Sequence, residues 1–353
     1  MEALVREVAE TNQAEREGST SWLLARVGVD ALQRARRRLQ AKAILIVTTV
    51  IVGYGLVILG HDSALPITAG LAMLAVGTYG SIAALMHDAN HGATFDSERL
   101  NHALGHWVEL FGASAYWWRH KHNGVHHVHP NIGDIDPDVQ QHPFLRLNPH
   151  QPWRWWYRLQ HLYAPVLYGF MMLHVAGSDG ISLAQLRNTS SRLRMHDTAV
   201  AVAGKALFLL WGWVVPFMVF GWRGLVGSFA LSWAVGLALA LTVQVAHAVD
   251  IVDHFAADGR DSDVAHQGSA TADVHSGRGP GAWLFRFLAG GLDRQVAHHL
   301  APSLPHTLYR ELQPHIEELF THHGVTYRYH RSIPAALGSH FRWLRELGKR
   351  PTN

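Results

Sequence analysis

Four long apolar stretches, arranged as two close pairs, dominate the hydrophobic pattern of this chain. Residues 43–60 and 64–86 contain no charged side chain and are separated by a short polar link. Residues 199–222 and 224–246 form the second pair, with Arg223 between them. Each stretch approaches the ~20 residues with which an α-helix crosses a hydrocarbon core of about 30 Å. The pattern predicts an all-α integral membrane protein with four transmembrane helices in two hairpins.

Basic residues predict how these spans are oriented. Arg34, Arg36, Arg37, Arg38 and Lys42 precede the first span, whereas the two hairpin links together hold one Arg. The positive-inside rule then places both termini in the cytoplasm, and we expect the inner (plasma) membrane of a cell. Residues 1–42 are expected to form an N-terminal interfacial segment and 43–353 a single membrane domain, with a helical cytoplasmic cap built from 87–198 and 247–353.

Composition narrows the classes of protein that fit. Only 16% of the residues are charged, which is low for a water-soluble surface, yet the mean hydropathy of +0.01 leaves room for large polar regions. The chain contains 27 His and no Cys, so disulfides, thiolate zinc sites and iron–sulfur clusters are excluded. The apolar stretch 153–175 is interrupted by Arg154, Arg158, His161 and Pro165, and its Trp cluster indicates an interfacial belt.

Histidines cluster where the predicted spans reach the cytoplasmic side. A first box, HDANH, follows the second span, and a second box, HNGVHH, lies about thirty residues later. A third box, QVAHH, lies near the C-terminus, and a single imidazole, His247, ends the fourth span. Residues four apart share a helix face, whereas the last His of the second box should be turned away by about 100° and serve a second metal. The histidines expected to converge are His87, His91, His122, His126, His127, His247, His298 and His299.

Eight imidazoles exceed what one metal needs. A structural zinc site takes four protein ligands and a catalytic one three, so eight predict two metals. The general-base Glu of a zinc protease is absent, because neither HExxH nor HxxEH occurs near the boxes. Imidazole ligands without thiolates suit a pair of irons that bind oxygen. A metal transporter is the alternative from another class, but it should carry its ligands near the membrane midplane.

The three boxes, with PNIGDIDPD after the second and GGLDRQVAHH at the third, resemble the membrane fatty acid desaturases. The resemblance covers about residues 45–345 and is closest to the linoleoyl-CoA-type branch, whose third box opens with Gln. It implies a mushroom-shaped helical protein whose cap holds a histidine-ligated di-iron (Fe²⁺) site, with O₂ as co-substrate. The eight histidines match the iron ligands, and Gln295 matches a weak ligand or an outer partner. Asp88, Asn131, Asp134, Asp136 and Asp138 match polar positions that orient the imidazole rings.

Three residues depart from the family pattern. Ala297 replaces the acid of the third box, Asp293 replaces an Asn, and Pro130 stands where Thr is common. These departures keep a hydroxylase, acetylenase or epoxidase on the same scaffold open beside desaturation.

The resemblance also implies partners. Unactivated methylene groups lack an acidic proton, so their C–H bonds need an oxygen-activating metal centre and two external electrons per turnover. The chain has neither Cys nor a glycine-rich dinucleotide motif, so we expect a separate donor such as a ferredoxin. The substrate is expected to be a fatty acyl chain on CoA, acyl carrier protein or a lipid, among membrane lipids and without a nucleic-acid partner.

Overall fold

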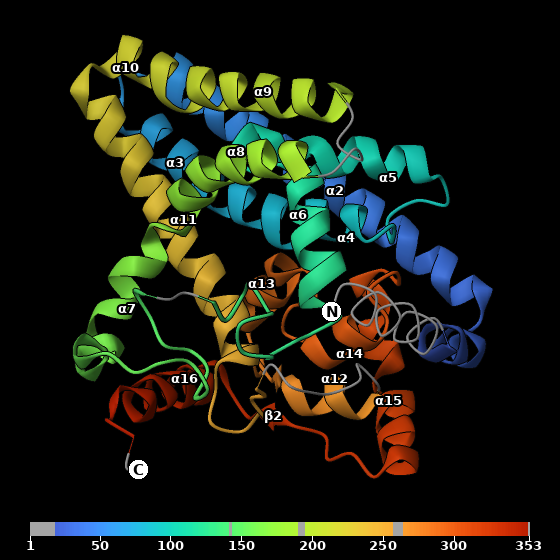
Figure 1. Cartoon of the computed structure of the whole chain (residues 1–353). Helices are drawn as coiled ribbons and strands as arrows, with labels where there is room; N and C mark the ends of the chain where they lie inside the picture. Colours follow the sequence, from blue (N-terminus) through green and yellow to red (C-terminus); the bar gives the residue numbers. More distant parts are fainter. Residues whose placement is uncertain (1–17, 141–142, 190–194, 257–263, 352–353) are drawn as a thin grey trace. The chain divides into compact units, whose positions relative to one another are not determined.

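A computed structural model describes residues 18–140, 143–189, 195–256 and 264–351 (Figure 1). The described chain is mostly helical and forms two interleaved compact units. Unit 1 comprises the described residues of 1–39, 121–165 and 241–353, and unit 2 comprises those of 40–120 and 166–240. The divisions between the two units fall within four helices, α2 (Val29–Leu59), α6 (Ala115–Lys121), α7 (Gln160–Gly169) and α11 (Trp222–His247).

The elements follow one another along the chain with short connections. The first half contains α2 (Val29–Leu59), α3 (Ala64–Gly80), η1 (Ser81–Met86), α4 (His87–Asn90), α5 (Glu98–Gly105), η2 (His106–Phe111), α6 (Ala115–Lys121), η3 (His122–His126), η4 (Trp155–Leu159), α7 (Gln160–Gly169) and α8 (Met171–Thr189). The second half contains α9 (Met195–Leu209), η5 (Leu210–Val214), α10 (Val215–Phe220), α11 (Trp222–His247), α12 (Val264–Ala270), β1 (Asp273–Val274), α13 (Pro280–Ala289), α14 (Gln295–Leu300), η6 (His306–Leu308), α15 (Tyr309–His323), β2 (Tyr329–His330) and α16 (Ile333–Gly348). The η1, η3 and η5 segments are π-helical turns.

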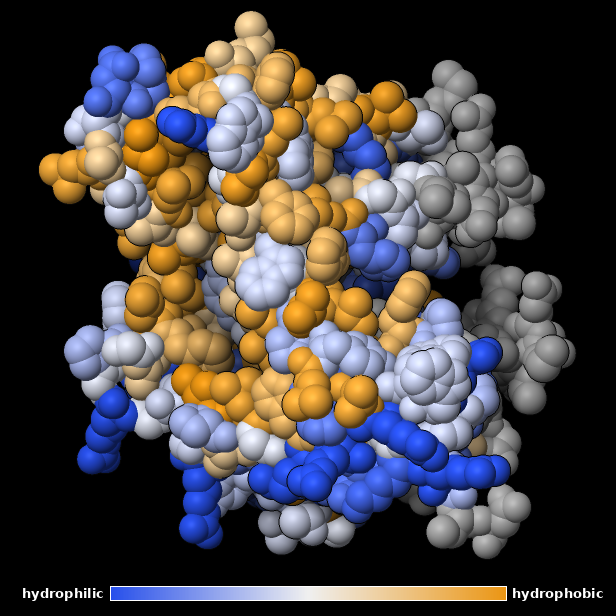
Figure 2. Space-filling view, turned by 90° about the vertical axis from the view of Figure 1, so that its left-hand side faces the viewer, coloured by the Kyte–Doolittle hydropathy of each residue, from blue (hydrophilic) through white to orange (hydrophobic). Residues whose placement is uncertain are grey.

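Four helical stretches are long and apolar enough to cross a membrane, which confirms the predicted number of candidate spans. They are Val29–Leu59, Ala64–Asn90, Asp197–Phe220 and Trp222–His247. Their outward side chains are hydrophobic, and Leu65 and Met218 are 79% and 78% exposed. Figure 2 shows many such hydrophobic side chains on the outside of the molecule. The segment 153–175 forms η4, α7 and part of α8, and none of these is among the candidate spans.

Glycines allow α2 and α3 to approach closely within unit 2. A Cβ on Gly70 would lie 2.6 Å from the carbonyl oxygen of Gly53 and 2.9 Å from the backbone nitrogen of Val57. A Cβ on Gly53 would in turn lie 3.0 Å from the carbonyl oxygen of Gly70. Small residues are the usual means by which membrane helices bring their backbones together.

Unit 1 is built around an apolar core that the N-terminal part of the chain completes. Leu23, Ala31, Leu32 and Ala35 pack with residues of α12, α14 and α15, including the fully buried Leu312. Residues 18–27 are helical, and α2 continues without a break through residue 42. Position 42 lies inside α2, and the boundary expected there stays a prediction. Residues 1–17 of the predicted interfacial segment lie outside the described residues.

Two short strands are the only departure from helix among the described elements. β1 and β2 pair in parallel, with Asp273 opposite Tyr329 and Val274 opposite His330. This pairing joins the segment before α13 to the segment after α15. Oδ1 of Asp273 on β1 also accepts a hydrogen bond at 2.9 Å from the backbone N–H of Val296, in the third histidine box on α14.

Candidate metal centre

The second histidine box lies on a π turn rather than on an α-helix. The backbone N–H of His127 donates to the carbonyl oxygen of His122 at 3.0 Å, five residues earlier. The extra residue in the turn rotates His127 back toward His122, and their Nε2 atoms lie 3.1 Å apart. The predicted rotation of His127 away from its neighbours is therefore wrong, because it assumed the α-helical repeat. Nothing in the sequence signals the π turn, although such turns recur at functional sites.

Six of the predicted ligands lie together in unit 1. His126, His247 and His299 form one group of buried side chains whose candidate ligand atoms lie within 4.8 Å of one another. His127, His298 and His299 form a second such group, and His122, His126 and Asp138 form a third. Three separate segments, η3, the end of α11 and α14, bring these residues together.

The outer nitrogens of several rings meet specific acceptors. Asp136 accepts from Nδ1 of His126 at 2.9 Å, and Gln267 Oε1 accepts from Nδ1 of His299 at 2.8 Å. The hydroxyl of Tyr309 lies 3.3 Å from Nδ1 of His298. A ring that donates from Nδ1 keeps the lone pair of Nε2, which is the arrangement of metal-binding histidines. The Nε2 atom of His126 is buried and has no hydrogen-bond partner, so it offers a ligand atom to a metal.

Gln295 contacts the isolated imidazole that ends the fourth candidate span. Its amide Nε2 donates to Nε2 of His247 at 2.9 Å, and both side chains are buried. The glutamine that opens the third box is thus a partner of His247.

Carboxylates on the loop after η3 set the charge of the cluster. Burial by itself lowers the pKa of His126, but the carboxylates of Asp136 and Asp138 outweigh it and raise this pKa. Burial would raise the pKa of Asp138, but Lys121, whose Nζ lies 2.9 Å away, and His126 hold it well below its usual range. Asp138 therefore stays ionised beside the imidazoles and favours a cation among them.

Asn131 acts on the backbone rather than on an imidazole ring. Its φ of +59° lies in the left-handed region, which Asn tolerates better than most residues. Its side-chain amide donates to the carbonyl oxygens of His247, Asp253 and Ala270 at 3.0, 3.1 and 3.0 Å. Its backbone N–H donates to Asp136 at 2.8 Å. Asn131 thereby ties the second box to the end of α11.

The remaining polar candidates contribute less to the six-histidine cluster. Asp134 is exposed, with a φ of +63°, and lies on a turn rather than beside an imidazole. Asp88 belongs to unit 2, and its Oδ1 lies 3.7 Å from Nδ1 of His87, beyond hydrogen-bond distance.

The first box forms its own arrangement in unit 2. His87 and His91 lie one helical turn apart at the end of the second candidate span, with ring centroids 4.8 Å apart. Both rings contact Trp118 edge to face, each at 5.5 Å. Arg119 donates to the side-chain oxygen of Asn90 at 2.7 Å. Both imidazoles thus lie against one indole at the end of a candidate span, and their predicted role as metal ligands stays a prediction.

Two functional candidates were missed from the sequence. Gln267 joins two boxes, since its Nε2 donates to the carbonyl oxygen of His127 at 2.8 Å while its Oε1 accepts from His299. Tyr309 lies on α15 beside His298. Neither belongs to a local motif, and α12, which carries Gln267, is far from both boxes in sequence. Only tertiary packing identifies them.

The residues that depart from the family pattern are buried or adjoin buried groups. Ala297 is fully buried on α14, and Asp293 is 5% exposed. The carbonyl oxygen of Pro130 lies 2.8 Å from Nε2 of His266, which can only donate to it. These substitutions leave the grouping of the six histidines intact.

The sequence was compared with protein families and with individual known proteins, and both comparisons point to fatty acid desaturases. Residues 63–331 match the sequence model of a family described as fatty acid desaturase. The acyl-lipid (8-3)-desaturase B of Dictyostelium discoideum is 31% identical over 283 residues, which cover 75% of this chain and 61% of that protein. The acyl-lipid (8-3)-desaturase of Physcomitrium patens is 30% identical over 279 residues, which cover 75% of this chain and 57% of that protein.

One further relative matches over more of its own length and more of this chain than the two desaturases above. The sn-1 linoleoyl-lipid 6-desaturase of Arthrospira platensis is 25% identical over 330 residues, which cover 88% of this chain and 86% of that protein. Several other relatives are longer than their matched part, and the match spans about 60% of their length.

Proposed function

We propose that this chain, which belongs to the fatty acid desaturase family, introduces a double bond into a fatty acyl chain in an oxygen-dependent reaction. The observation that carries the proposal is the six-histidine cluster of unit 1, in which two groups of three imidazoles share His299. Two sets of imidazole ligands suit a pair of metal ions better than one ion.

The ligand set of the proposed di-iron centre comprises eight histidines. Those of unit 1 are His122, His126, His127, His247, His298 and His299. His87 and His91 join them in the proposal because their box occupies the place in the chain where the family carries its first ligands. The donor chemistry fits iron, since the buried Nε2 of His126 needs a partner and its Nδ1 is held by Asp136. Gln295, Asp88 and Asp138 are proposed as outer partners.

An iron pair held by these histidines would supply the oxygen-dependent chemistry for removing hydrogen from a methylene group, which side chains cannot perform. The surrounding residues position the imidazoles. Asp136 and Gln267 fix the tautomers of His126 and His299, because each accepts from Nδ1. Asn131 keeps the second box and the end of α11 in register. Asp138 contributes negative charge that offsets the cations.

Electrons must come from outside the chain in this proposal. Each turnover consumes two electrons besides those taken from the substrate, and the sequence has no Cys to hold an iron–sulfur centre. A separate donor such as a ferredoxin supplies them. The substrate is proposed to be an acyl chain carried by a membrane lipid, because several relatives are named as acyl-lipid or linoleoyl-lipid desaturases.

The membrane arrangement belongs to the same proposal. The four candidate spans form two hairpins in the inner (plasma) membrane, with both termini in the cytoplasm. Support comes from the basic residues of α2, among which Arg34, Arg37 and Arg38 are exposed, and from the single Arg in the two links.

The test is to purify the full chain, measure its iron content, and supply oxygen, a ferredoxin system and lipids with defined acyl chains. Two irons per chain and a product lighter by two mass units are expected. A product heavier by sixteen mass units would assign hydroxylation instead, and bound zinc without oxygen consumption would overturn both. His298→Ala should lose iron and activity, whereas His323→Ala, an exposed residue at the end of α15, should retain both.

A further inference from the structure

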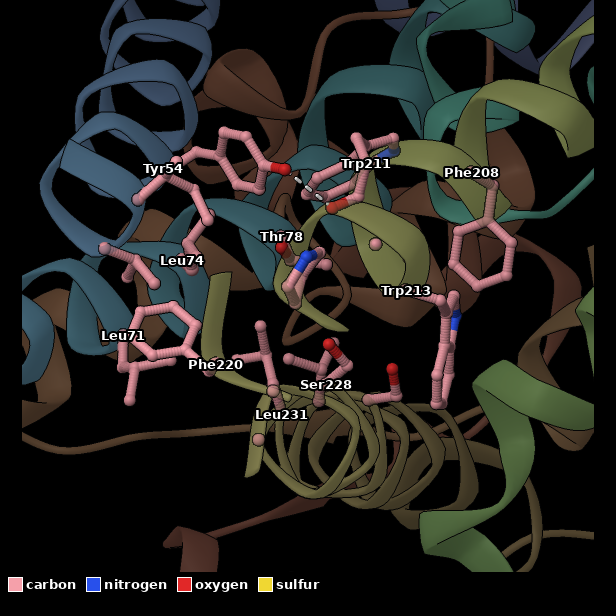
Figure 3. Close-up of a pocket in the computed structure, with 18 of the residues that line it drawn as sticks. Tyr54, Leu71, Leu74, Thr78, Phe208, Trp211, Trp213, Phe220, Ser228 and Leu231 are labelled. Atoms are coloured by element: carbon pink, nitrogen blue, oxygen red, sulfur yellow. Dashed lines mark hydrogen bonds between the residues drawn. The ribbon is translucent and has the colours of Figure 1, made fainter. Parts of the chain in front are cut away.

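Unit 2 contains an apolar cavity of about 250 Å³ that none of the histidine boxes lines (Figure 3). Its walls come from α2, α3, η2, α9, η5, α10 and α11, with one residue of α8. Most lining residues are aliphatic or aromatic, and the polar ones are Thr78, Ser228, Ser232 and Arg223. Thr78, on α3, precedes His87 by nine residues, which corresponds to roughly 14 Å of helix. The cavity is therefore a separate site from the first histidine box.

One polar group in the cavity wall lacks a partner. Thr78 is 7% exposed, and its hydroxyl oxygen is buried without a hydrogen bond. Figure 3 shows Thr78 at the cavity between Tyr54 and Ser228. A buried hydroxyl without a partner is costly, and lipid chains cannot provide one within a membrane-spanning helix. A ligand that carries an acceptor oxygen would satisfy it.

Aromatic rings form much of the remaining wall, and the polar groups of Tyr54 and Trp211 already have partners. The hydroxyl of Tyr54 donates to the carbonyl oxygen of Trp211 at 2.8 Å. The ring nitrogen Nε1 of Trp211 donates to the carbonyl oxygen of Leu110 at 2.6 Å. Tyr54 meets Trp211 edge to face, with ring centroids 5.3 Å apart. Phe208 meets Trp213 in the same way at 6.5 Å. Such walls suit a flat ring, because aromatic rings pack well edge to face or offset.

The π turn η5 places two of these rings. It spans Leu210–Val214 and so includes both Trp211 and Trp213, which line the cavity. A single-turn interruption of this kind inside a membrane helix often marks a functional position. The cavity wall thus combines an irregular helix, aromatic rings and one buried hydroxyl without a partner.

We propose that this cavity binds the ring of a prenyl quinone, with one ring carbonyl accepting a hydrogen bond from Thr78. A carbonyl accepts a hydrogen bond from the Thr78 hydroxyl without adding a donor of its own. A saturated acyl chain leaves Thr78 without a partner. The prenyl tail extends toward the bilayer along the apolar wall.

Binding is measured on the full chain in phospholipid nanodiscs, with a ubiquinone that carries one isoprene unit as the probe. Quenching of tryptophan fluorescence, checked by equilibrium partition, gives the dissociation constant without any enzyme assay. Thr78→Val keeps the side-chain shape and should weaken binding about tenfold, the effect of one hydrogen bond. The matched control is Thr49→Val, whose hydroxyl bonds Leu45 on α2 outside the cavity; its affinity should match that of the unaltered protein.

A second variant fills the cavity. Gly227 lines the cavity, and a Cβ there would meet nothing within 4 Å, so Gly227→Leu should fold and abolish quinone binding. Unchanged affinity of Thr78→Val or of Gly227→Leu would overturn the proposal. If either variant fails to fold, competition on the unaltered protein decides the question. Displacement of the probe by methyl stearate or cholesterol at equal concentration would overturn the quinone assignment, and failure to displace it would support that assignment.

Discussion

At the scale of single residues, the outer hydrogen bonds of the imidazoles determine how the cluster can bind a metal. Asp136 is fully buried and divides its two carboxylate oxygens between His126 and the backbone N–H of Asn131. Gln267 uses both ends of its amide, one on the backbone of the second box and one on a ring of the third. Each residue therefore fixes a ring and a chain segment at the same time.

Asp136→Asn should lower the affinity for iron about 10- to 100-fold, the usual effect of losing such a partner. The neutral amide accepts a weaker hydrogen bond from His126 and no longer raises the basicity of its ring. The affinity is measured by competition with a chelator. Asp134→Asn is the matched control, since Asp134 is exposed on the same loop, and equal losses in the two variants would contradict the role of Asp136.

Gln267→Leu should also weaken iron binding about 10- to 100-fold, because the ring of His299 loses its acceptor and is free to adopt another tautomer. Gln267→Glu keeps an acceptor oxygen facing His299 and should retain more iron than Gln267→Leu. The absorption spectrum of the iron-loaded protein reports on the ligand field directly. Identical spectra and affinities for Gln267→Leu and the unaltered chain would exclude this role.

At the scale of elements, π turns set the register of the functional side chains. The turn η3 carries His122 and His126, and its bond from His127 to His122 brings all three rings of the second box to one side. The turn η1 ends immediately before His87. If η3 were a regular α-helix, the side chains of the second box would point in different directions relative to His122. The grouping of these rings therefore depends on the π turn.

Inserting one Ala after Gly124 should add a further residue to η3 and rotate His126 and His127 by about 100° relative to His122. We expect iron binding to be lost while the helical circular dichroism is retained. Gly124→Ala is the control, since a Cβ there meets nothing within 4 Å and the register is unchanged. Iron binding by the insertion variant at the normal stoichiometry would contradict this role of the π turn.

At the scale of the whole molecule, buried imidazoles outside the cluster link stability to pH. His340 is fully buried on α16, and its Nδ1 donates to the carbonyl oxygen of Ala248 at 2.7 Å. Burial lowers its pKa to about 4, well below the ordinary value near 6.5. The folded chain therefore binds this proton more weakly than the unfolded chain does.

Stability should fall as the pH decreases from about 6.5 to about 4, because protonation then favours the unfolded chain. A shift of this size corresponds to roughly 3 kcal/mol for His340 as an upper limit. His340→Gln can still donate to Ala248 but does not titrate, so its stability should depend less on pH. Denaturant unfolding of the metal-free protein at pH 7 and pH 4.5 measures the difference, and equal pH dependence of both proteins would contradict the assignment.

The sequence by itself determined the helical class, the four candidate spans and the identity of the histidine boxes. Long uncharged stretches have few stable alternatives to a spanning helix, since the bilayer leaves no partner for open backbone groups. The spacing of the histidines is also visible within short stretches of sequence. His87, His91 and the second and third boxes could therefore be identified as candidate ligands from the sequence. The boundary expected at residue 42 stays a prediction, and α2 runs through that position.

Tertiary structure alone decided which groups surround the histidines. Gln267 and Tyr309 reach the boxes through contacts between segments distant in sequence, and a single Gln or Tyr carries no periodic signal. The turn at Asn131 and the π turn of η3 are fixed by their hydrogen bonds. The local sequence around each of them is compatible with several conformations. Position along the chain therefore identified the candidate ligands, whereas packing determined their rotation and their outer hydrogen-bond partners.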